Sequence, residues 1–325
     1  MGENLTLVQA VRDGLRDEMA EDDDVLVMGE DVGKNGGVFR ATEGLYDEFG
    51  EDRVIDTPLA ESGIVGTAIG MAAYGLKPVP EIQFSGFMYP GFDQIVSHMA
   101  RLRTRSRGRF TCPMVLRAPF GGGIRAPEHH SESKEAFYVH EAGLKVAIPS
   151  TPHDAKGMLV AAIRDPDPVI FLEPKKIYRA FREEVPDGPY EVELGEAAVR
   201  REGSDVSVFT WGAMTRPTLE AAENMADDVD VEVVDLRTLS PLDEETIVES
   251  FEKTGRAAIV HEAPKTAGVG AEITATLQEE TLLHQEAPVK RVTGFDVPFP
   301  LAALEDYYLP EPERIESGIR ETVEF

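Results

Sequence analysis

The sequence has a single cysteine and lacks a long apolar run. Cys112 is the only cysteine among 325 residues, which excludes a disulfide framework and a metal centre built from several thiolates. It lies in an apolar, strand-like segment before Pro113, so we interpret it as a small core residue. The first 24 residues are rich in acids and contain no apolar stretch of membrane-spanning length. We therefore expect a cytoplasmic protein with no membrane partner.

Positive charge is scarce. The chain carries 32 Lys and Arg residues against 60 Asp and Glu residues, for a formal net charge of -28. Binding to nucleic acid needs a basic face, so we expect no nucleic acid partner. The acids are spread along the chain and only 10 of the bases are Lys, which is typical of a halophilic protein or simply of an acidic one. The basic run RLRTRSRGR, residues 101–109, is interpreted as a solvated helix end or a subunit contact.

Several nucleotide-binding and catalytic motifs are also absent. No Gly-x-Gly-x-x-Gly opens a helix after the first strand, which argues against a dinucleotide site. The run Gly121-Gly122-Gly123 lacks the Lys-Ser/Thr of a phosphate-binding loop and is interpreted as a flexible hinge. No serine stands in a nucleophile-elbow pattern.

Apolar segments alternate with amphipathic ones along most of the chain. Continuous apolar strands separated by helices predict an α/β fold with a parallel sheet covered on both faces. The polar segment 175–200, with Pro186 and Pro189, reads as a linker with a short extended piece. We therefore expect two three-layer α/β/α domains, residues 1–186 and 187–325. The spacing of Leu7, Val11, Leu15 and Met19 predicts a helix after Thr6, and another helix is expected over residues 90–103. The expected strands are residues 25–28, 53–56, 79–84, 114–119, 144–150, 168–174, 205–211, 231–236, 257–262 and 289–294.

Glu61 is an acid among small and apolar residues, in DTPLAESGIVGTAIG (residues 56–70). We expect it to be buried at the start of a helix over 61–76, whose Gly63, Gly66 and Gly70 share one face. Glycine weakens a helix by about 1 kcal/mol relative to alanine, so this face suits the close approach of another backbone. Glu61 is either a helix N-terminal acid or a carboxylate that bonds a buried ligand nitrogen.

His129 and His130 follow a predicted strand in the loop FGGGIRAPEHHSES. Adjacent residues do not project together from a regular element, so they are not expected to be paired metal ligands. A loop at the carboxyl end of a parallel strand is where α/β proteins place their sites. One of the two is therefore a candidate acid or base, and a structural hydrogen-bonding role is the alternative.

Eight segments carry a family resemblance that runs from about residue 5 to the C-terminus. They resemble the beta subunits of the thiamine-diphosphate-dependent 2-oxo acid dehydrogenases, the decarboxylating components of the pyruvate and branched-chain 2-oxo acid dehydrogenase complexes. The resemblance implies a pyrimidine-binding domain followed by a transketolase C-terminal-like domain. The segments are GEDVGKNGGVFRATEGL, RVIDTPLAESGIVG, EIQFSGFMYPGFDQIV, GLKVAIPSTPHDAKG, FLEPKKIYRA, LRTLSPLDEETI, EKTGRAAIVHEAP and EAPVKRVTGFDVPFP.

The resemblance also implies roles for individual residues. Glu61 matches the glutamate that bonds N1' of the cofactor's aminopyrimidine and exchanges a proton with it. Leu59 matches a residue lining that pocket, Phe87 the aromatic that stacks on the ring, and His130 the active-site histidine; His129 receives no role. Relatives also bind a structural potassium ion. The matching positions here are Met114, Ala162, Ile163, Asp165 and Asp167.

The Gly-Asp-Gly motif that holds magnesium and the diphosphate in this family does not occur in the chain. The resemblance therefore implies an alpha subunit that supplies both, in an α2β2 assembly active only when complete. It further implies acyl transfer to the lipoyl group of a dihydrolipoyl acyltransferase, docked by the C-terminal domain. The substrate stays open between pyruvate and branched-chain 2-oxo acids. A split transketolase-type enzyme and a non-catalytic structural partner are the alternatives.

Overall fold

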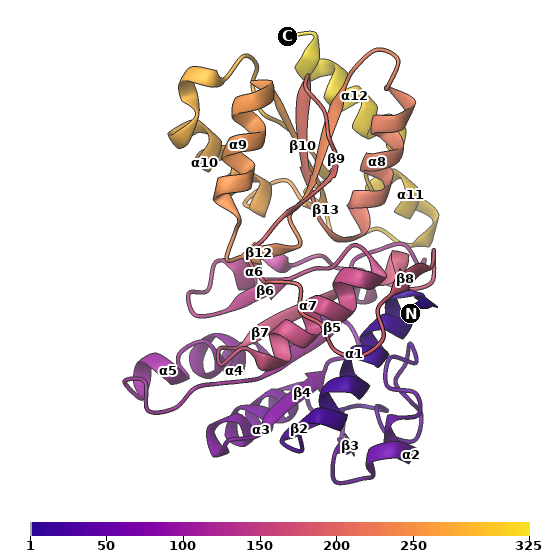
Figure 1. The fold of residues 1–325 in the computed structure, drawn as a ribbon, viewed down its shortest axis with the longest axis vertical. Coiled ribbons are helices and arrows are strands. Elements are labelled where there is room, and N and C mark those ends of the chain that lie inside the picture. The colour runs from indigo at the N-terminus through magenta and orange to yellow at the C-terminus, as the bar shows by residue number, and fades with distance from the viewer. Residues whose placement is uncertain (1) are drawn as a thin grey trace.

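The computed structural model describes residues 2–325, and its strands form two large sheets, one in the lower and one in the upper half of Figure 1. The lower sheet has seven strands in the order β12-β6-β7-β5-β4-β2-β3, parallel except for the antiparallel pair β12–β6. Most of its strand residues are buried, as expected for a sheet covered on both faces. Its strands are β2 (Val25–Gly29), β3 (Val54–Asp56), β4 (Lys77–Glu81), β5 (Val115–Phe120), β6 (Lys145–Ala147), β7 (Val169–Pro174) and β12 (Thr238–Ser240).

The helices of this half follow the predicted spacing in most places. In α1, the buried positions Leu7, Val11 and Leu15 recur at helical spacing, and the Thr6 N–H donates to the Gln9 side-chain oxygen at 3.0 Å to cap the helix. The helices are α1 (Leu7–Glu21), α2 (Leu45–Phe49), α3 (Glu61–Tyr74), α4 (Phe92–Gln94), α5 (Leu102–Arg105), α6 (Glu135–Val139) and α7 (Pro152–Arg164).

One expected helix is divided. Residues 90–103 form no single α-helix, because Pro90 lies within the 3-10 turn η1 (Ser85–Gly91) and a π-helical turn, η2 (Ile95–Met99), separates α4 from α5. Two further 3-10 turns, η3 (Glu128–His130) and η4 (Lys175–Ile177), follow β5 and β7.

The upper sheet has five strands in the order β14-β13-β10-β11-β9, parallel except for β9. Its strands are β9 (Ala198–Arg201), β10 (Val206–Thr210), β11 (Val231–Asp235), β13 (Ala257–Pro264) and β14 (Lys290–Gly294). Its helices are α8 (Thr215–Asn224), α9 (Glu244–Thr254), α10 (Val269–Glu280), α11 (Glu305–Tyr308) and α12 (Pro312–Val323), with 3-10 turns η5 (Gly212–Met214), η6 (Leu282–His284) and η7 (Ala302–Leu304). The α/β fold with parallel-rich sheets is thus confirmed.

The two halves are tied together. The segment expected as a linker holds β8 (Glu183–Val185), which pairs with β1 (Glu3–Leu5), and also β9, which we did not expect. Strand β12 follows β11 of the upper sheet in the chain, but it pairs with β6 of the lower sheet. Apolar side chains of both halves, such as Leu172 and Phe209, belong to one buried cluster. The division at residues 186/187 stays a prediction. None of the helices formed by residues 2–325 has the length and apolar character needed to cross a membrane.

Candidate functional site

Four chemically interesting residues follow the carboxyl ends of neighbouring parallel strands. Glu30 comes directly after β2, Glu61 follows β3, Phe87 follows β4 and His130 follows β5. These strands are adjacent in the order β5-β4-β2-β3, so their carboxyl ends lie at the same edge of the sheet. That edge is where open α/β sheets bind ligands.

Glu61 is the first residue of α3, as predicted, but it is half-buried rather than buried. The reason is that the chain leaves this end of α3 uncovered: Leu59, two residues earlier, is 78% exposed. Sequence reasoning missed Glu30, which lies close enough for its pKa to be affected by Glu61. Burial, and then the charge of Glu61, raise the pKa of the Glu30 carboxyl. The edge of the sheet therefore carries a pair of interacting carboxylates.

His130 and Phe87 are brought together in an aromatic cradle. The His130 ring centroid lies 4.5 Å from that of Phe84 and 4.9 Å from that of Phe87, both edge-on. Its Nδ1 atom is buried and has no hydrogen-bond partner within residues 2–325. A buried polar atom without a partner is rare and indicates a place for a ligand or a water molecule. His129 is exposed and stays without a role.

Close backbone contacts join α3, η1 and η3. A Cβ atom added to Gly86 would lie 2.0 Å from the carbonyl oxygen of His129, so only glycine allows η1 to approach η3 in this way. A Cβ atom added to Gly91 would lie 3.3 Å from the carbonyl oxygen of Glu61, at the start of α3. The turn η1, which carries Phe87, therefore packs on one side against the start of α3 at Glu61 and on the other side against η3, which ends at His130.

The glycine face of α3 is exposed. Gly63, Gly66 and Gly70 all face away from the core, and a Cβ atom on Gly70 would meet nothing within 4 Å. On Gly66 it would meet only the Gln94 side chain, at 3.7 Å. No neighbour within the described chain requires glycine at these two positions, which agrees with packing against another chain.

The remaining candidates have structural surroundings. Cys112 is buried, and burial raises the pKa of its thiol to about 12. In the basic run, Arg101 pairs with Glu141 at 2.8 Å, and Arg103 pairs with Asp167 at 2.6 Å.

The polar groups at the expected potassium site already have partners within the chain. The Asp167 carboxylate is held by Arg103, and the Asp165 carboxylate pairs with Lys145. Of the carbonyl oxygens, that of Met114 accepts from the Val169 N–H at 3.0 Å, and that of Ala162 accepts from the Asp165 N–H at 3.3 Å. Both carboxylates are thus paired with cationic side chains, and the potassium site stays a prediction.

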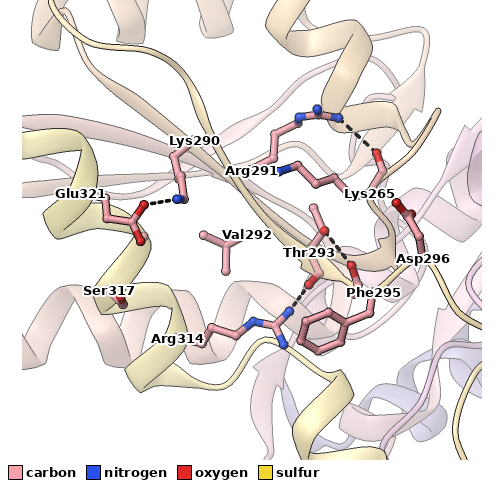
Figure 2. Close-up of a pocket in the computed structure, with 12 residues that line it drawn as sticks. Lys265, Lys290, Arg291, Val292, Thr293, Phe295, Asp296, Arg314, Ser317 and Glu321 are labelled. Carbon is pink, nitrogen blue, oxygen red and sulfur yellow. Dashed lines mark hydrogen bonds and ion pairs between the residues drawn. The ribbon is translucent and has the colours of Figure 1, made fainter. Parts of the chain in front are cut away.

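The upper half contains a pocket of about 380 Å³ (Figure 2). It is formed by β14, α12 and the loops beside them, and it contains none of the candidate site residues. Lys290 and Glu321 form an ion pair across it, and Arg314 donates to the Thr293 carbonyl oxygen. Residues 2–325 contain no group of three or more His, Cys, Asp or Glu side chains arranged to hold a metal ion. The candidate site thus offers an acid, an exposed apolar residue, an aromatic ring and an unpartnered imidazole nitrogen, and the roles of these residues toward a cofactor stay predictions.

Comparisons with known proteins identify the family of the chain. Residues 3–180 match the family model "Transketolase, pyrimidine binding domain", and residues 195–315 match "Transketolase, C-terminal domain". The chain is 53% identical over 322 residues to the pyruvate dehydrogenase E1 component subunit beta of Bacillus subtilis, covering 99% of both chains. It is 52% identical over 317 residues to the protein of that name from Acholeplasma laidlawii, covering 97% of both. A solved structure described as a split gene transketolase, an inactive beta4 tetramer, superimposes with a TM-score of 0.82 over 99% of both chains; at 22% identity it shows the fold alone.

Proposed function

Because the chain belongs to the family of pyruvate dehydrogenase E1 component beta subunits, we propose that it catalyses, with an alpha subunit, the oxidative decarboxylation of a 2-oxo acid. The acyl group passes to the lipoyl group of a dihydrolipoyl acyltransferase. The observation that carries this proposal is the 53% identity to the Bacillus subtilis subunit over 99% of both chains. Both relatives are pyruvate dehydrogenase subunits by name, which favours pyruvate over branched-chain 2-oxo acids.

In the proposed site, bound thiamine diphosphate would supply the nucleophilic carbon and the electron sink for decarboxylation. Phe87 would stack on the aminopyrimidine, Leu59 would line its pocket, and Glu61 would hold and return a proton at ring nitrogen N1'. His130, in its cradle of Phe84 and Phe87, offers Nδ1 to move a proton at the substrate.

Partner subunits are part of the proposal. The exposed Leu59 and the exposed glycine face of α3 support an interface that completes the site. The alpha subunit would bind magnesium and the diphosphate, since the chain has no Gly-Asp-Gly sequence. We infer an α2β2 assembly whose beta C-terminal domain docks the acyltransferase.

The test is an assay of the co-purified alpha and beta chains with thiamine diphosphate, magnesium and an artificial electron acceptor. Turnover is expected with pyruvate and to be weaker with branched-chain 2-oxo acids. The reverse order would reassign the substrate. Ketol transfer from a ketose phosphate, without 2-oxo acid turnover, would favour a split transketolase. No turnover of either kind would favour a non-catalytic partner.

A further inference from the structure

The loop that leads from β5 to His130 donates backbone hydrogen bonds to two buried carboxylates of the upper half, and we call this set of bonds the grip on the loop. We refer to residues 121–125 as the glycine loop. Glu262, on β13, is 4% exposed and accepts a hydrogen bond from the Gly122 N–H at 2.8 Å. Glu305, the first residue of α11, is 2% exposed and accepts from the Gly123 N–H at 3.0 Å and from the Arg125 N–H at 3.1 Å. The glycine loop is therefore held, and its interpretation as a flexible hinge is wrong.

These bonds fix the path of the main chain. A carboxylate is costly to bury unless hydrogen bonds satisfy it, and bonds from a charged acceptor are stronger than those between neutral groups. Both carboxylates reach backbone N–H groups, so the constraint acts on the loop's conformation. Burial raises the pKa of Glu262, and its bond from Gly122 acts in the opposite direction.

The shape of the loop matches this grip. Gly121 has φ +77°, and a Cβ atom there would lie 2.4 Å from the Glu262 carboxylate. Gly123 has φ +97°, and its Cβ would lie 2.4 Å from the side chain of Lys176. Only glycine combines this backbone conformation with such close neighbours.

The grip continues to the proposed catalytic histidine. The Lys175 ammonium group donates to the Gly121 carbonyl oxygen and lies 5.8 Å above the ring centre of Phe84. Phe84 in turn packs edge-on against His130. His130 itself is five residues beyond Arg125, the last amide that Glu305 holds.

We propose that Glu262 and Glu305 are positioning residues, which hold the glycine loop so that His130 stays in its aromatic cradle. The upper half of the molecule thereby sets the geometry of a site built on the lower sheet. The role assigned to His130 rests on the proposed function, whereas the grip on the loop does not.

The grip is tested by hydrogen exchange and mass spectrometry on the co-purified alpha–beta enzyme. Glu305→Ala is expected to speed exchange of the Gly123 and Arg125 amides by about 10- to 100-fold, as expected for the loss of hydrogen bonds to a charged group. Glu305→Gln, which keeps one acceptor oxygen, is expected to restore most of the protection. Glu262→Ala is expected to affect Gly122 in the same way.

Asp306→Asn is the matched control for the first test. Asp306 pairs with the Arg125 side chain at the surface, 2.8 Å away, and makes no bond to the glycine-loop amides. Its loss is expected to leave exchange of this loop unchanged. Unaltered exchange in both alanine variants would show that Glu262 and Glu305 do not hold the glycine loop.

The positioning role is tested by a double-mutant cycle on turnover. Glu305→Ala is expected to lower kcat by about 10- to 100-fold, since a small misplacement of a catalytic group has effects of this order. In a His130→Ala background the same change is expected to have no further effect. Additive losses would contradict action through His130. Full turnover by His130→Ala alone would refute both the proposed role of His130 and the positioning role, while leaving the exchange result intact.

Discussion

Two glutamates at equivalent helix positions distinguish the interpretations of Glu61. Glu61 opens α3 and Glu244 opens α9, and each is the first residue of its helix. Glu61→Gln is expected to lower turnover by about 10²- to 10⁴-fold, because glutamine can hydrogen-bond N1' but cannot exchange a proton with it. Decarboxylation would be followed with an artificial electron acceptor at saturating cofactor.

Glu244→Gln is the control. It removes a helix N-terminal acid without touching the site, so the expected loss is about 0.3–1 kcal/mol of stability with turnover unchanged. If Glu61→Gln behaved in the same way, with turnover within about threefold of the unmodified enzyme, Glu61 would be only a helix-terminal acid.

The buried His261 predicts that the folding stability of the protein falls as the pH becomes acidic. Its ring is fully buried and stacked on Trp211 at 5.1 Å, and burial, followed by the charge of Arg291, lowers its pKa to about 3. Between pH 6.5 and 3 the unfolded chain takes up a proton that the folded chain excludes. Stability is therefore present above pH 6.5 and is lost as pH falls, by up to about 1.4 kcal/mol per pH unit.

The matching variant is His261→Phe. Urea unfolding at several pH values between 6.5 and 4 would compare its slope with that of the unmodified chain. We expect a shallower pH dependence in the variant, whatever its absolute stability. Equal slopes would mean that His261 does not titrate in this range.

At the scale of elements, a substitution on the glycine face of α3 is expected to have opposite effects on the stability of the isolated chain and on subunit assembly. Gly70→Ala is expected to raise the unfolding free energy of the isolated chain by about 0.5–1 kcal/mol, because alanine favours a helix and nothing lies within 4 Å of the new Cβ. The same change is expected to weaken subunit assembly. Thermal melts of the chain and analytical ultracentrifugation of the alpha–beta mixture would measure the two effects.

Gly143→Ala gives the contrast. Gly143 has φ +101°, and its Cβ would lie 2.2 Å from the Ala100 carbonyl oxygen, so this change is expected to destabilise the isolated chain. Unchanged assembly by Gly70→Ala would exclude a close contact at that position of α3.

Elements with a strong local signal were predictable, and those defined by distant partners were not. The spacing of Leu7, Val11 and Leu15 was enough for α1, because the helix buries one stripe. Strand β12 is three residues long and exists only because it pairs with β6, about 90 residues earlier in the chain. No local pattern in LRTLSPL reveals such a pairing.

At the scale of the whole molecule, the charge predicts a dependence on salt. A net charge of -28 repels itself, and the screening length falls from about 10 Å at 0.1 M salt to about 3 Å at 1 M. We expect Tm to rise between dilute and multimolar potassium chloride. The uncharged osmolyte trimethylamine oxide stabilises proteins without screening charge, so comparing it with potassium chloride distinguishes charge screening from general stabilisation by an excluded solute. A Tm independent of potassium chloride would contradict the halophilic interpretation.

The site shows the same limit of prediction as the fold. The positions of Glu61 at a helix start and His130 after a strand follow from local sequence and from the order of the strands. The partners of the glycine loop, Glu262 and Glu305, lie 140 and 182 residues from the amides of Gly122 and Gly123. A contact across that distance depends on how the two sheets stack, which no local pattern specifies.

The pairing of β12 with β6 also matters while the chain is being made. A ribosome completes β6 at Ala147 and reaches Ser240 only 93 residues later, a delay of roughly 5 to 20 s at about 5–20 residues per second. Throughout that interval the nascent lower sheet has an unpaired edge, which is a template for association with other chains. We therefore expect the nascent chain to be prone to association with other chains until β12 has been made and has paired with β6.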